Sequence, residues 1–86
     1  MATKAELAKR YVMAQRRVYR MEAELAAAEA GFYLEAAEKE PEQSETWKKN
    51  YARKKVAPLL NKLAQAKGDL IEAKTLYSLA GGKVCD

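Results

Sequence analysis

The sequence predicts an all-α fold: a coiled-coil-like antiparallel helical hairpin that completes a helical bundle by oligomerisation or by docking on a partner. Alanine, leucine, glutamate, lysine and arginine dominate the composition, and only four glycines and two prolines occur in 86 residues. Such a composition is typical of long helices. Apolar residues also recur at alternating steps of three and four along two separate stretches. A chain of this length forms one domain, so we expect residues 1–86 to be a single helical hairpin.

The first stretch carries an apolar seam on one side of a long helix. Thr3 is suited to cap this helix and Glu6 completes a capping box, so the helix is expected over about residues 4–39. A seam of this kind requires a partner helix. Its members are Leu7, Tyr11, Ala14, Val18, Met21, Leu25, Ala28 and Phe32.

Residues 40–45 are the predicted turn, because Pro41 cannot continue the first helix. Ser44 is a suitable N-cap for a second helix over about residues 46–79. Pro58 is expected to kink this helix over 54–57 or to break it in two, and the kink is favoured because Ala57 is a poor cap. Gly81 and Gly82 then end the helix and leave residues 80–86 as a loose tail.

The second helix has its own seam, which fixes how the two helices pair. Folding near residue 43 places Leu25 against Leu63, and Val18 against Leu70. Tyr11 and Tyr77 should then form an aromatic layer at the open end. Residues 22–45 hold eight glutamates and residues 46–67 hold seven cations, so this fold brings opposite charges together. The seam consists of Ala52, Val56, Leu59, Leu63, Ala66, Leu70, Ala73, Tyr77 and Ala80.

Apolar residues outside the two seams predict association. A second, alanine-rich line follows the first helix, and leucines and an isoleucine widen the stripe on the second. Two hairpins packed as a four-helix bundle would cover these residues most simply, while higher oligomers or docking on a different protein stay open. The candidate interface residues are Val12, Tyr19, Ala23, Ala26, Ala30, Tyr33, Leu60, Ile71, Leu76 and Leu79.

The net charge of +4 collects at the open end of the hairpin, where residues 1–21 hold six cations and one acid. Arginine forks can bind phosphate oxygens and tyrosine rings can stack on bases, so this end is a candidate anion site. A solvated face that pairs with an acidic partner is the alternative. The residues of the candidate site are Arg10, Tyr11, Arg16, Arg17 and Arg20.

A second basic run, residues 48–55, lies beside Trp47 and Tyr51. Cations interleaved with aromatic rings are typical of nucleic-acid patches. The favoured interpretation is an internally neutralised face, because the run is expected to lie opposite the glutamates.

Several kinds of chemistry are not expected. The chain has no histidine, which removes the commonest general base and metal ligand, so no catalytic residue, metal site or cofactor is predicted. Cys85 is the only cysteine and cannot form an intrachain disulfide, which favours the cytoplasm. No signal peptide or membrane span is recognisable.

In outline, a short basic helical hairpin with arginine and tyrosine at one end resembles several small phage-encoded proteins, including some that self-assemble and sequester nucleotide signals. The resemblance is one of shape and transfers no binding residue. The sequence thus predicts a non-catalytic interaction or assembly protein, acting as an adaptor, structural component or inhibitor. The alternative is an anion-binding protein that holds nucleic acid or a nucleotide on the arginine and tyrosine patch.

Overall fold

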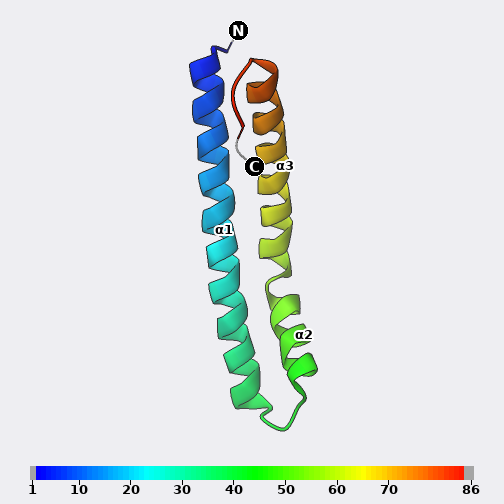
Figure 1. Ribbon diagram of the computed structural model, residues 1–86. Coiled ribbons are helices and arrows are strands. Elements are labelled where there is room, and N and C mark those ends of the chain that lie inside the picture. Colours follow the sequence, from blue (N-terminus) through cyan, green and yellow to red (C-terminus); the bar gives the residue numbers. More distant parts are fainter. Residues whose placement is uncertain (1, 85–86) are drawn as a thin grey trace.

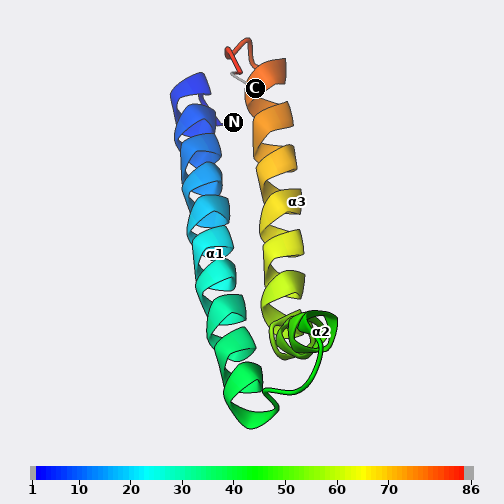
Figure 2. The ribbon, with the colours of Figure 1, turned by 60° about the horizontal axis from the view of Figure 1, so that its bottom comes forward.

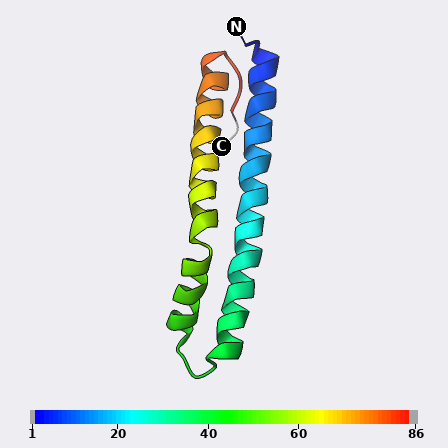
Figure 3. The same cartoon turned by 180° about the vertical axis from the view of Figure 1, so that it is seen from behind.

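Three helices form an antiparallel hairpin in the computed structural model, which describes residues 2–84. Helix α1 spans Lys4–Lys39, α2 spans Glu45–Lys55 and α3 spans Ala57–Leu79. Helix α1 packs along both α2 and α3, as Figures 1 and 3 show from opposite sides. No strand occurs among the described residues, and the predicted all-α hairpin is confirmed.

The hairpin is a rod rather than a sphere. Its extents are 58 × 20 × 14 Å and its radius of gyration is 17.9 Å. A compact domain of this length would have a radius of gyration of about 12 Å. Most residues therefore lie close to the surface, and the core is a single line of side chains between the helices.

Both expected N-caps are present. The backbone N–H of Glu6 donates to the Thr3 hydroxyl at 3.2 Å, and the N–H of Trp47 donates to the Ser44 hydroxyl at 3.1 Å. Each bond satisfies an N–H that the first helical turn leaves without a partner. The chain turns between the end of α1 and Ser44, with the N–H of Gln43 donating to the Glu40 carbonyl.

Pro58 is associated with a break between two helices, whereas a kink in one continuous helix was the favoured prediction. Val56 follows the last residue of α2 and precedes the first of α3, with φ −93° and ψ 3°. Proline has no N–H for the Lys54 carbonyl, and its ring crowds that carbonyl. Figure 2 shows α2 nearly end-on while α3 is seen from the side, so the two axes are inclined. Val56 itself is 1% exposed and fills the junction.

The core follows the two seams. Val18, Leu63 and Ala66 are buried together, and Met21, Leu25 and Leu70 pack against them. These contacts agree with the predicted pairing of the helices. Ala36 is buried although it lies outside the predicted seam, and Ala80, which the predicted seam includes, is exposed. The buried apolar residues are Tyr11, Val18, Ala36, Ala52, Val56, Leu63, Ala66 and Ala73.

The segment after α3 makes a defined turn, although a loose tail had been expected. The N–H of Gly82 donates to the Tyr77 carbonyl at 3.0 Å and that of Gly81 to the Ser78 carbonyl at 3.0 Å, which is a Schellman motif. Gly81 has φ +87°, where a side chain would be strained. The chain then runs back along the hairpin (Figure 1). Val84 is half-buried. Cys85 lies outside the described residues.

Candidate functional site

A groove of about 820 Å³ runs beside the α1 and α3 contact near the open end. We call it the arginine groove. It brings together all four arginines that the sequence singled out. The lining residues are Arg10, Met13, Ala14, Arg16, Arg17, Arg20, Met21, Glu24, Ala66, Asp69 and Ala73.

The four arginines of the groove differ in their partners. A terminal nitrogen of Arg10 lies 3.4 Å from a Glu72 carboxylate oxygen, and one of Arg17 lies 3.8 Å from Asp69. Both pairs are well exposed and hence contribute little to stability. Arg16 and Arg20 form no ion pair within the described part of the chain. Two guanidinium groups are thus held toward α3, and two remain available to a ligand.

Tyr11 does not line the arginine groove, although the sequence placed it in the candidate anion site. Its side chain is 7% exposed, and its ring centroid lies 5.8 Å from that of Tyr77, as the predicted aromatic layer requires. The Gln15 side-chain amide donates to the Tyr11 hydroxyl at 3.1 Å. A base could stack on Tyr11 only after this layer opened.

Most of the candidate interface residues have side chains that are exposed to solvent. The most exposed are Leu79 at 80%, Tyr19 at 67% and Ile71 at 65%. Val12, Leu60 and the three alanines are also exposed, while Tyr33 and Leu76 are half-buried. Three further exposed apolar side chains, Met13, Leu34 and Trp47, were not among these candidates. Leu34 lies four residues after Ala30, so the same helical step would have found it.

Ion pairs show which flanks of the two helices share a face. Lys67 of α3 reaches Glu22 of α1 at 3.8 Å, on the flank of the α1 seam opposite Arg17. Residues one turn from these two therefore lie on the same side of the hairpin. They include Tyr19 and Ala26 on α1, and Ile71 and Ala64 on α3. This surface, which we call the apolar face, continues in a hollow of about 510 Å³ lined by Ala26, Glu29, Ala30, Tyr33, Lys49 and Arg53.

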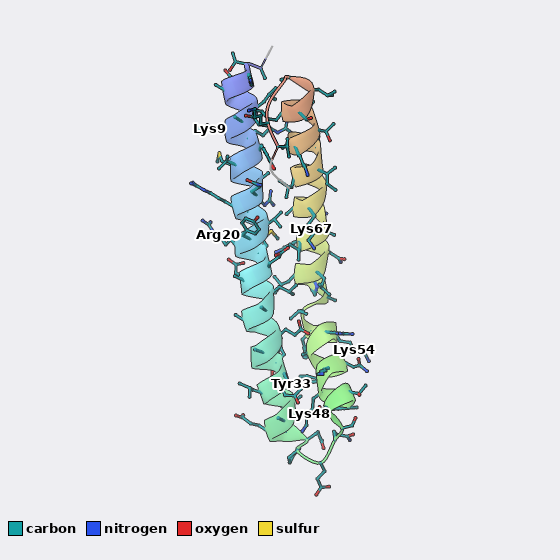
Figure 4. All side chains as sticks on the ribbon, in the orientation of Figure 1. Lys9, Arg20, Tyr33, Lys48, Lys54 and Lys67 are labelled. Carbon is teal, nitrogen blue, oxygen red and sulfur yellow. The ribbon has the colours of Figure 1, made fainter. Side chains whose placement is uncertain are left out.

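The cations of α2 form no ion pair with the glutamates of the described chain, although a neutralised face is the favoured interpretation. These cations are Lys48, Lys49, Arg53, Lys54 and Lys55, and none forms an ion pair with a carboxylate among residues 2–84. One ion pair, between Glu22 and Lys67, joins the predicted acidic and basic blocks. Figure 4 shows Lys48 and Lys54 on α2, with Tyr33 on α1 at a similar level.

Glu35, the half-buried carboxylate near α2, is bound within α1. The Lys39 ammonium donates to it at 2.8 Å, and this hydrogen bond lowers the pKa of the Glu35 carboxyl below its ordinary value of 4.5. The same hydrogen bond raises the pKa of Lys39. Two residues of α2 also lower the pKa of the Glu35 carboxyl: Tyr51 through a side-chain hydrogen bond and Lys55 through its charge.

No group of three or more potential metal ligands occurs among the described residues. None of the three helices combines the length and the apolar character needed to cross a membrane.

In the comparisons with known proteins, no family model, curated protein or solved structure matches the chain.

Proposed function

We propose that this chain is a non-catalytic interaction protein that self-associates and acts through protein contacts, as an assembly component, adaptor or inhibitor. The observation that carries the proposal is its exposed area of 6529 Å². A folded monomer of 9.6 kDa exposes about 5,100 Å². The excess is larger than the ~800 Å² that one partner contributes to an interface of standard size.

The apolar face is suited to receive a second copy. Tyr19 and Ile71 stand on its two helices with about two-thirds of their surface in water. Alanines between the larger side chains on α1 permit close approach of another helix. Two hairpins packed face to face would form a four-helix bundle with a two-fold axis, in which each copy contributes the same surface.

Mass measurement by light scattering between about 1 and 100 µM tests self-association. The expected mass is a multiple of the 9.6 kDa chain. A Tyr19→Glu, Ile71→Glu variant should shift the mass toward one chain, because it places four unpaired charges in a two-copy interface. The control is Met13→Glu, which places a charge on an exposed apolar side chain of the arginine groove, on the other flank of α1. A protein that remains one chain at every concentration would contradict the proposal.

A second candidate function is anion binding in the arginine groove. It is favoured by four arginines in one groove, of which Arg16 and Arg20 have no carboxylate partner. These two are one helical turn apart, about 6 Å along the axis, so both can reach one linear polyanion. The groove and the apolar face lie on opposite flanks of the α1 seam, and the two functions are therefore compatible.

The second candidate is tested by the anisotropy of a labelled oligonucleotide. We expect an Arg16→Gln, Arg20→Gln variant to bind at least tenfold more weakly, and a Lys62→Gln, Lys67→Gln variant, with the same loss of charge, to bind nearly as the parent does. Equal affinity for all three proteins would contradict binding in the groove.

A further inference from the structure

Helix α2 carries an aromatic pair at its surface, of which Trp47 is exposed and Tyr51 is half-buried. The rings of Trp47 and Tyr51 are stacked, with centroids 5.8 Å apart and an interplanar angle of 22°. Trp47 is 38% exposed. Packing of α2 on α1 relies instead on Ala52, which is 0% exposed, and on Val56 at the junction. The large aromatic surface of Trp47 thus has no full partner within the described chain.

The aromatic pair borders a hollow whose other walls are polar and basic. It measures about 370 Å³ and is lined by Trp47, Asn50, Tyr51, Arg53 and Lys54. We call this surface the α2 patch. Asn50 can both donate and accept hydrogen bonds, whereas Arg53 and Lys54 offer only donors.

The charge around the α2 patch is strongly one-sided. Helix α2 holds five cations and one acid, Glu45, in 11 residues. Lys48 donates to the Pro41 carbonyl at 3.4 Å, and the Lys55 ammonium lies 5.6 Å from the Tyr51 ring centroid. As no ion pair neutralises these cations among the described residues, a polyanion would meet a concentrated positive field.

The α2 patch is also held in place at both ends. Ser44 caps the first turn of α2, and Val56, directly after the last turn, is buried. A ligand would consequently meet a preformed surface and would not have to order the helix, which lowers the cost of binding.

From this geometry we propose that the α2 patch binds single-stranded nucleic acid: a base stacks on Trp47, and the flanking phosphates contact Arg53 and Lys54. Stacking requires a base whose face is free, as in a single strand, and it tolerates any base sequence. An acidic peptide would match the charge but would leave the indole ring unused. This proposal is independent of self-association and of the arginine groove.

Trp47 provides a local probe, because it is the only tryptophan in the chain. Titration with a short oligothymidylate in 50 mM salt should quench its fluorescence to saturation. If Arg53 and Lys54 contact about two phosphates, raising the salt to 200 mM should weaken binding about 7-fold. An Arg53→Gln, Lys54→Gln variant should bind at least tenfold more weakly. The matched control is Lys4→Gln, Lys9→Gln at the far end of the rod, which should keep most of the affinity.

The anisotropy of a labelled strand checks the role of the ring. Trp47→Ala should weaken binding about 5- to 100-fold, and Trp47→Phe should weaken it less, because phenylalanine keeps an aromatic face. Circular dichroism of each variant shows whether the helices are retained, and Asn50→Ala serves as a second probe if Trp47→Ala unfolds. Absence of quenching by the oligonucleotide would overturn the proposal. Equal quenching by polyglutamate or by inorganic polyphosphate would also overturn it, since neither contains a base.

Discussion

Leu63 and Leu79 are identical residues on one helix, yet their surroundings are opposite. Leu63 is 6% exposed and packs with Val18 and Ala66, whereas Leu79 is 80% exposed. We expect Leu63→Ala to lower the free energy of unfolding by about 2–4 kcal/mol, because it removes buried methyl groups and leaves a cavity. Leu79→Ala should change it by less than about 0.5 kcal/mol. Urea unfolding followed by circular dichroism measures both, and equal losses would contradict the assigned core.

Substituting alanine for two of the glycines should change the stability of the protein in opposite directions. A Cβ atom at Gly82 would overlap the Tyr77 ring, so Gly82→Ala should destabilise the protein by about 1 kcal/mol or more. A Cβ atom at Gly68 meets nothing within 4 Å, and Gly68→Ala inside α3 should stabilise by about 0.5–1 kcal/mol. Thermal unfolding of the two variants is the measurement. A Gly82→Ala variant as stable as the parent would show that the turn does not pack against Tyr77, and a destabilising Gly68→Ala would contradict the open space around Gly68.

At the residue scale, the sequence predicts correctly those contacts that form between residues close together in the chain. The caps at Thr3 and Ser44 depend on neighbours three residues away, and the seams depend on helical spacing alone. The surroundings of Tyr11 were harder to assign. Spacing predicted that Tyr11 contacts Tyr77 and also that it lies beside the arginines. The packing shows that the contact with Tyr77 keeps Tyr11 out of the arginine groove.

The break between α2 and α3 is the main feature at the scale of the elements. The backbone still forms bonds on both sides of it, from the Val56 N–H to the Ala52 carbonyl and from the Leu60 N–H to the Val56 carbonyl, each 3.0 Å long. Whether proline kinks or interrupts a helix depends on which geometry lets nearby side chains pack. Here Val56 is buried at the interruption, a tertiary contact that the sequence alone does not reveal.

Pro58→Ala should convert α2 and α3 into one continuous helix. The substitution restores an N–H that can donate to the Lys54 carbonyl and removes the ring that crowds it. We expect greater helicity by circular dichroism and slower amide exchange over residues 56–60, with stability changed by no more than about 1 kcal/mol. Unchanged exchange in this segment would indicate that the burial of Val56, rather than the proline, maintains the break.

For the whole molecule, the proposed self-association would make stability depend on protein concentration. One seam between two helices is a small core, and the apolar face leaves more surface to be covered. Unfolding of a two-copy assembly releases chains, so its Tm should rise by about 3–5 °C for each tenfold increase in concentration. Calorimetry over a hundredfold range measures this slope. A Tm that does not change with concentration would contradict a stabilising self-contact.

The fold of the molecule followed from the sequence more fully than its surfaces did. The arginines of the groove and the residues of the apolar face were identified from helical spacing. The basic run of α2 was interpreted as a neutralised face, but a single ion pair, between Glu22 and Lys67, joins the predicted acidic and basic blocks within the described residues. The inclination of α2, which follows from the break, determines where those side chains lie.

Contacts join the two arms of the hairpin at both ends. The connecting turn lies at one end, and the Tyr11 and Tyr77 layer lies at the other, next to the turn in which Gly82 donates to the Tyr77 carbonyl. Between these ends, Pro58 provides no amide donor for the Lys54 carbonyl, so local opening of the backbone should begin at the junction of α2 and α3 although Val56 is buried there. Trypsin under native conditions would then first cut after Lys54 or Lys55, and mass spectrometry of the earliest fragments would locate this weak point.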